Sequence, residues 1–404
     1  MFKIIANLFT FVIELSQTSV YNCKILIVYI CKMKRIDIDE LSSWYHIHHE
    51  KNLEERYLNL KQMQPYLAGL NDGFKVKKIG ESFERRDIYT LVFGEGKTNL
   101  LLWTQMHGNE STGTRALLDL IKFFSDPGSL SWLSSHILQE CTIHCIPMLN
   151  PDGAEAYTRI NAQGIDLNRD VIEKRAVESR LLQKVLKSVN PHYCFNLHDQ
   201  RTIFSVGPKN EPATLSFLAP SIDEQRTLTA GRIQTMEVIV AMSEFLQQTI
   251  PDSIGRYTDE FYPTATGDNF QKMGHNTILI ESGHSKGDYK RKEARRATFM
   301  ALLEGLRYIS TQEEKVDHKK YFKIPDNEKK YLDIIIKNVK VDGEDADIGI
   351  LFIEKLKEGK VQFIASVDKL HDLSDYNADK ILDGKNLDFT NQSDVENWVK
   401  NKLN

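Results

Sequence analysis

His107 and Glu110 stand three residues apart in the stretch Thr104-Gln-Met-His-Gly-Asn-Glu-Ser-Thr-Gly113, which follows an apolar run and leads into a helical pattern. Two side chains at this spacing in a turn can converge on one point. An imidazole and a carboxylate together supply two of the three protein ligands of a catalytic zinc site. The pair also occurs often by chance, as a capped helix with a solvated carboxylate, so alone it indicates a metal only weakly.

Further polar groups each follow a short apolar run that is typical of a buried strand. They are the turn Asn150-Pro-Asp-Gly153, His198 and Glu281. In open α/β sheets, sites form at the carboxyl ends of the strands. Any one of these groups can be an ordinary turn or strand-end residue, but their shared position favours a common site.

The elements that must position these residues alternate between strands and helices. Strand-like runs lie at residues 74–79, 87–93, 100–103, 142–146, 193–197 and 277–280, and helical patterns lie at 37–70, 111–124, 173–189, 233–246 and 290–308. This alternation predicts an α/β fold with a mixed, mostly parallel central sheet flanked by helices.

The last part of the chain has a different pattern. Residues 311–320 are rich in lysine and indicate a linker, and short strand-like runs with charged turns follow. We therefore predict a small β-rich C-terminal domain over residues 321–404, after a main domain over 37–310 and an N-terminal extension over 1–36. The predicted C-terminal domain contains one histidine, His371, and no cluster that resembles a site.

Residues 1–36 contain two apolar runs, 4–13 and 25–31. Neither is long enough to span a bilayer, so we expect no stable membrane span. Translation that begins at Met33 gives an ordinary amino terminus, and on that interpretation the protein is cytoplasmic. The alternative is export, if residues 1–31 act as a signal or an anchor.

Charge and cysteine content exclude several classes of protein. The net charge is −4, and no basic stripe is interleaved with aromatic residues, so we expect no nucleic-acid partner. The five cysteines form no Cys-x-x-Cys pair, which argues against a disulfide framework and against a thiolate zinc site.

The stretch Arg159-Ile-Asn-Ala-Gln-Gly-Ile-Asp-Leu-Asn-Arg169 is the most informative one. Two arginines bracket a loop that follows the Asn150–Gly153 turn. A guanidinium is always charged and forms paired hydrogen bonds, so such a loop can bind a carboxylate or a developing oxyanion. The alternative is a loop with two solvated arginines.

Together these motifs resemble those of the zinc carboxypeptidase family, and they are most similar to those of its carboxypeptidase E and N branch. His107-Gly-Asn-Glu110 is similar to the first zinc motif of that family, and Asn150–Gly153 and Arg159–Arg169 are similar to the next two blocks. The resemblance covers about residues 37–308 and implies a carboxypeptidase-like fold.

The resemblance implies roles for the metal ligands and the catalytic residues. One zinc ion per chain would be held by His107, Glu110 and His198. Glu281 would be the general base and acid. Arg159 would polarise the scissile carbonyl group and stabilise the oxyanion.

The resemblance also implies how substrate is bound. Asn168 and Arg169 would bind the free C-terminal carboxylate of a peptide, and Tyr262 would cover the bound substrate. Asp268 is a candidate for favouring a basic terminal side chain, or else a turn residue. His198 is followed by Asp199-Gln200-Arg201 instead of the small residues typical of the family, which indicates altered subsites.

The implied function is hydrolysis of the C-terminal peptide bond, with a peptide or small amide that carries a free carboxylate as substrate. One alternative is a zinc amidohydrolase of the related acylase branch, acting on acyl-amino acids or a peptidoglycan peptide. A second alternative is a non-catalytic binding module on the same fold. The intact Arg159–Arg169 block, the match at Tyr262 and the domain size favour the carboxypeptidase over the acylase. The complete set of ligands and Glu281 argue against the non-catalytic module.

Overall fold

The computed structural model describes residues 35–311 and 315–403 of the 404-residue chain. The predictions for residues 1–31, a start at Met33 or an export signal, therefore lie outside the described residues, and the cellular location stays a prediction. None of the helices in the described ranges has the length and apolar character needed to cross a bilayer.

An eight-stranded sheet forms the centre of the molecule, in the order β1-β2-β4-β3-β5-β10-β8-β9. Its inner strands β4, β3, β5 and β10 are parallel, whereas β1 and β2 on one side and β8 on the other join antiparallel. The strands are β1 Lys75–Glu81, β2 Asp87–Phe93, β3 Thr98–Trp103, β4 Cys141–Ile146, β5 Tyr193–Asp199, β8 Leu215–Leu218, β9 Ile254–Arg256 and β10 Asn276–Ser282. The predicted α/β class with a mixed central sheet is confirmed.

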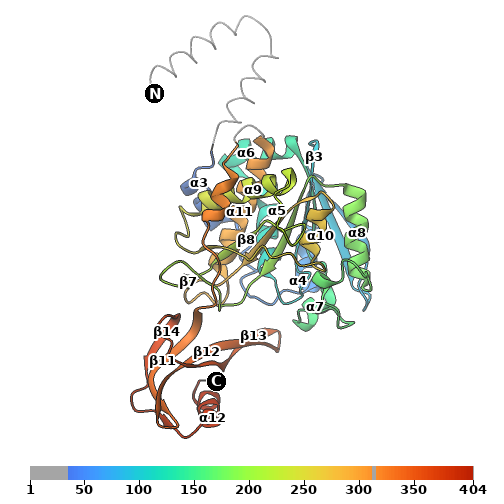
Figure 1. The fold of residues 1–404 in the computed structure, drawn as a ribbon. Helices are drawn as coiled ribbons and strands as arrows, with labels where there is room; N and C mark the ends of the chain where they lie inside the picture. Colours follow the sequence, from blue (N-terminus) through green and yellow to red (C-terminus); the bar gives the residue numbers. More distant parts are fainter. Residues whose placement is uncertain (1–34, 312–314, 404) are drawn as a thin grey trace, which may run out of the picture.

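Helices cover both faces of this sheet (Figure 1). They are α3 Ile38–His48, α4 Leu60–Ala68, α5 Thr112–Ser125, α6 Ser131–Glu140, α7 Pro151–Ala156, α8 Val177–Val189, α9 Ala230–Leu246, α10 Thr266–Lys272 and α11 Lys292–Thr311. The helical pattern predicted over residues 37–70 is two helices, because Asn59 caps α4 and residues 49–59 between them are not helical.

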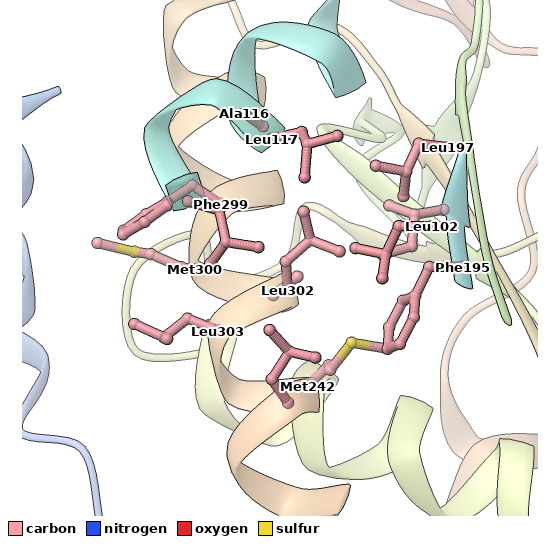
Figure 2. Close-up of a cluster of buried hydrophobic side chains, with 14 of the residues drawn as sticks. Leu102, Ala116, Leu117, Phe195, Leu197, Met242, Phe299, Met300, Leu302 and Leu303 are labelled. Atoms are coloured by element: carbon pink, nitrogen blue, oxygen red, sulfur yellow. The ribbon is translucent and has the colours of Figure 1, made fainter. Parts of the chain in front are cut away.

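Successive side chains of β3 enter different cores, which explains its continuous apolar run. Leu100 and Leu102 pack in the core beneath α5, α9 and α11, whereas Leu101 and Trp103 pack on the face covered by α8 and α10. Figure 2 shows part of the first core, where side chains of α5 and α11 meet Leu102 and Phe195. A strand buried on both faces holds its carboxyl end rigidly.

A second sheet lies below the main domain in Figure 1. Its order is β13-β12-β11-β14, and β15 pairs with β11. The strands are β11 Tyr331–Val341, β12 Glu344–Lys357, β13 Lys360–His371, β14 Asn377–Asp383 and β15 Asp388–Phe389, followed by α12 Gln392–Lys402, which packs Val395 and Val399 on the sheet. We call residues 331–403 the C-terminal sheet.

The chain stays on the main domain beyond the predicted linker. Tyr321 is fully buried in the core that contains α9 and α11, and its hydroxyl accepts a hydrogen bond from the backbone N–H of Ala219, 3.0 Å away. The backbone of Glu328 pairs with that of Ser205. The domain boundaries at 310 and 321 stay a prediction, but this packing indicates that the main domain extends to about residue 328.

Candidate metal centre and substrate cleft

The turn after β3 and the ends of β5 and β10 bring the candidate chemistry together. His107 and Glu110 lie between β3 and α5, and His198 lies near the end of β5, beside β3 in the sheet. Glu281 of β10 is in register with His198. Because these strands are parallel neighbours, their carboxyl ends meet at one edge of the sheet.

A close backbone contact fixes the first turn against the Asn150–Gly153 turn. A Cβ atom on Gly108 would lie 1.9 Å from the carbonyl carbon of Gly153, so a larger residue at position 108 would force the two turns apart. The Asn150 side chain also donates to the carbonyl oxygen of Met106. The two motifs recognised separately in the sequence therefore support one another in space.

His107, Glu110 and His198 form one buried cluster. Their ligand atoms all lie within 4.8 Å of one another, and each residue is at most 7% exposed. Each Nδ1 atom of the two histidines is 2.9 Å from a different oxygen of Glu110, and the two Nδ1 atoms are 3.1 Å apart. Two imidazole nitrogens and a carboxylate are a donor set suited to a catalytic zinc ion, so the residues fit this metal.

Asp166 orients the first histidine. His107 Nε2 lies 3.1 Å from Asp166 Oδ1, and a hydrogen bond from Nε2–H leaves the Nδ1 lone pair directed at the cluster. Burial raises the pKa of Asp166, but His107 and Arg159 outweigh it and hold that pKa below its usual value. The sequence analysis missed this role, although Asp166 lies inside the Arg159–Arg169 block.

Glu281 is a carboxylate with an unusual environment. Its Oε2 atom is buried and has no hydrogen-bond partner in the described part of the chain. Burial, reinforced by the negative charges of Glu110 and Asp199, raises the pKa of Glu281 well above its usual value, while Arg159 and Arg291 oppose the shift. A carboxylate in such surroundings is suited to taking up and releasing a proton.

Arg159 lies beside the cluster. Its Nε donates to Asp166 Oδ2 at 3.0 Å, and its Nη1 donates to Glu110 Oε1 at 3.3 Å. Its side chain is 47% exposed. The guanidinium therefore lies next to the candidate ligands and remains accessible from the cleft.

Asn168, Arg169 and Tyr262 form a second group of residues in the cleft. The guanidinium of Arg169 lies over the ring of Tyr262, 4.4 Å from its centre, and Asn168 Oδ1 accepts from the backbone N–H of Thr266. Tyr262 is 52% exposed. The stacked pair presents a cation and an exposed aromatic ring to the same cavity.

One cavity of about 540 Å³ unites these residues. All eight side chains to which the resemblance gives a role line it: His107, Glu110, Arg159, Asn168, Arg169, His198, Tyr262 and Glu281. Their roles stay predictions, but the geometry brings every one of them to the same space. Arg56, Asp199, Arg291 and Glu354, which the sequence analysis did not single out as site residues, line it too.

The comparisons with known proteins agree with this geometry. A model of the zinc carboxypeptidase family matches residues 63–192, a range that includes His107, Glu110, Arg159 and Arg169. This part of the chain is similar to the zinc carboxypeptidase family. Of the site residues that line the cavity, His198, Tyr262 and Glu281 lie beyond the matched range.

Curated carboxypeptidases are among the relatives found. Carboxypeptidase 2 of Trichophyton tonsurans is 28% identical over 114 residues, which cover 28% of this chain and 21% of that protein. Carboxypeptidase M of Mus musculus is 27% identical over 173 residues, 36% of this chain and 39% of that protein. The chain thus spans well under half the length of these relatives.

Solved structures support the carboxypeptidase fold. A metallo-carboxypeptidase from Burkholderia cenocepacia superimposes with a TM-score of 0.51 at 15% identity, covering 64% of this chain and 70% of that chain. Thrombin-activatable fibrinolysis inhibitor gives a TM-score of 0.53 at 14% identity, covering 65% and 78%. At such identities the likeness establishes the fold alone.

Proposed function

We propose that this protein is a zinc-dependent metallocarboxypeptidase that hydrolyses the C-terminal peptide bond of peptides. The proposal depends above all on one observation: a His-Glu-His cluster, a buried carboxylate and the Asn168–Arg169 pair converge in one cavity. The family match and the carboxypeptidase relatives support the same activity.

In this proposal one zinc ion per chain is held by His107, Glu110 and His198. The ion would polarise the scissile carbonyl group and lower the pKa of a water molecule at its open position. Glu281 accepts a proton from the attacking water and passes it to the leaving amine. Arg159 stabilises the negative charge that develops on the carbonyl oxygen.

Substrate selection follows from the second group of residues in the cleft. Asn168 and Arg169 bind the free carboxylate of the peptide, and Tyr262, whose ring lies against the Arg169 guanidinium, covers the bound substrate. A guanidinium at a fixed distance from the catalytic residues restricts cleavage to the terminal bond, because only that bond then reaches them.

The function is tested with purified protein whose zinc content is measured. Peptides that differ only in the last residue, and acyl-amino acids in parallel, are assayed for release of the terminal amino acid. We expect turnover of peptides by the zinc-containing protein. Turnover of acyl-amino acids alone would instead support the acylase alternative.

Replacing Arg169 with alanine tests the carboxylate contact. Hydrogen bonds to charged groups contribute about 1.5–3 kcal/mol, so KM for peptides with a free C-terminus should rise by about ten- to a hundredfold. Steady-state kinetics measure this. The matched control is Arg175→Ala, since Arg175 follows in the same region but is 67% exposed and pairs with Glu173. An unchanged KM in Arg169→Ala would argue against the contact.

The position of Asp268 in the cavity predicts that the enzyme's preference for the terminal side chain of the peptide depends on pH. Burial raises the pKa of Asp268, which lines the cavity, to about 6. Its negative charge is therefore absent below this pH and present above it. The ratio of kcat/KM for a lysine-ending over a leucine-ending peptide should rise by about tenfold, or about 1.4 kcal/mol, as pH increases through this value. Asp268→Asn should abolish the rise, whereas a parent ratio independent of pH would refute the preference.

A further inference from the structure

Glu354 belongs to β12 of the C-terminal sheet, yet it lines the cavity of the metal centre. Its Oε1 accepts a hydrogen bond from Arg56 Nη1 at 2.5 Å, and its Oε2 accepts one from the hydroxyl of Tyr157 at 2.6 Å. Both partners belong to the main domain. The C-terminal sheet therefore contributes a charged side chain to the cleft.

Arg56 is a buried cation with few partners. It is 7% exposed and lines the cavity, and its Nε is buried without a hydrogen-bond partner among residues 35–311 and 315–403. An arginine has five N–H donors, and a buried donor without a partner costs about 1–3 kcal/mol. Such a group indicates a ligand that brings an oxygen acceptor.

A chain of contacts connects Arg56 to the residues that are expected to bind the carboxylate. The backbone N–H of Asn168 donates to Asp166, which contacts His107 of the cluster. Ser111, which is adjacent to Glu110 of the cluster, donates its hydroxyl to the carbonyl oxygen of Arg56. Arg56 lines the same cavity as the cluster and Arg169, so a peptide whose carboxylate is bound by Arg169 and whose scissile bond lies at the cluster can extend its amino side towards Arg56.

The pair formed by Arg56 and Glu354 carries almost no net charge. Burial raises the pKa of Glu354, but Arg56 and Arg291 outweigh it and lower that pKa below its usual value, so the carboxylate is ionised beside the guanidinium. A neutralised guanidinium favours an uncharged acceptor, such as a peptide carbonyl oxygen, over a carboxylate. Without Glu354 the guanidinium would lose its ion-pair partner, and the preference would shift towards a carboxylate.

We propose that Arg56 binds a main-chain carbonyl oxygen of the substrate on the amino side of the scissile bond. Glu354 acts through Arg56 as a positioning residue that makes this subsite select carbonyl groups over carboxylates. The C-terminal sheet is thereby a specificity-determining part of the cleft. This inference rests on the proposed carboxypeptidase function.

A second contact between the two parts of the molecule provides the control. Asp379 of β14 lies 3.0 Å from Nε2 of His284 and accepts hydrogen bonds from the Tyr331 hydroxyl and the Gly287 backbone. This contact ties the C-terminal sheet to the loop after β10 without lining the cavity. If the C-terminal sheet only stabilised the main domain, Asp379→Asn and Glu354→Gln would change the substrate preference in the same way.

The test compares one dipeptide with a free amine, an acetyl cap or a succinyl cap. The acetyl cap adds the carbonyl group, and the succinyl cap adds a carboxylate as well. The parent should prefer the acetyl form. Arg56→Gln should lower the acetyl-over-free ratio of kcat/KM by about tenfold, and so should Arg56→Lys, which keeps the charge but loses the planar fork.

Glu354→Gln should raise the succinyl-over-acetyl ratio by about tenfold, because Arg56 then carries an unbalanced charge. Asp379→Asn should keep the ratios of the parent. An unchanged succinyl-over-acetyl ratio in a zinc-containing Glu354→Gln protein, or an equal change in Asp379→Asn, overturns the inference. Binding of the three peptides to Glu281→Gln gives the same comparison without turnover, so failure of the carboxypeptidase activity is distinguished from failure of this subsite.

Discussion

Glu281→Gln is expected to lower kcat by about 10²- to 10⁴-fold while zinc content and peptide binding stay unchanged. Glutamine has nearly the same shape as glutamate but cannot accept the proton of the attacking water. Glu281 is not one of the three clustered ligand residues, so the metal should remain. The raised pKa of Glu281 suits it to proton transfer.

Steady-state kinetics, zinc analysis and peptide binding by calorimetry measure the three quantities on the same sample. Glu260→Gln is the matched control, because Glu260 is a carboxylate that lines the same cavity but is exposed and lies near Tyr262. It should keep kcat near that of the parent. A Glu281→Gln protein that retains full kcat would remove Glu281 from the mechanism.

His198→Ala is expected to remove zinc and activity together. The substitution leaves two ligands of the three that a catalytic zinc site needs, and it opens space in a buried cluster. Metal affinity should fall by more than the 10- to 100-fold typical of losing a residue that only orients a ligand. Zinc per chain is measured after dialysis against a weak chelator.

His275→Ala controls for loss of a histidine as such. His275 lies just before β10, at the end of that strand remote from the cluster, and hydrogen bonds to the carbonyl oxygen of Pro191. It should retain one zinc ion and full activity. Stoichiometric zinc in a folded His198→Ala protein would exclude His198 as a ligand.

The centre of the fold and the candidate site follow from local sequence patterns. Apolar runs that end in His198 or Glu281 are strands of the central sheet, and parallel strands bring their carboxyl ends together whatever lies between them in the sequence. The turn that carries His107 and Glu110 and the Asn150–Gly153 turn could each be recognised from a short local motif. Gly108 and Gly153 permit the close backbone contact that joins these two turns in space.

The missed features depend on contacts between distant parts of the chain. Glu354 follows an ordinary strand pattern, and nothing near it in sequence indicates that it meets Arg56. Tyr321 directly follows the lysine-rich stretch interpreted as a linker, but one aromatic side chain buried between helices holds it on the main domain. The C-terminal sheet therefore appeared to lack chemistry, although it lines the cleft.

The measurement that tests the central claim most directly uses two peptides identical except at the C-terminus, one with a free carboxylate and one amidated. Both are incubated with zinc-containing protein, and released amino acids are followed by mass spectrometry. The account predicts that the free peptide loses its last residue and that the amidated peptide is cleaved at least about tenfold more slowly, because Arg169 has no carboxylate to bind. Equal cleavage of both peptides, or cleavage at internal bonds, would contradict the assignment of a carboxypeptidase.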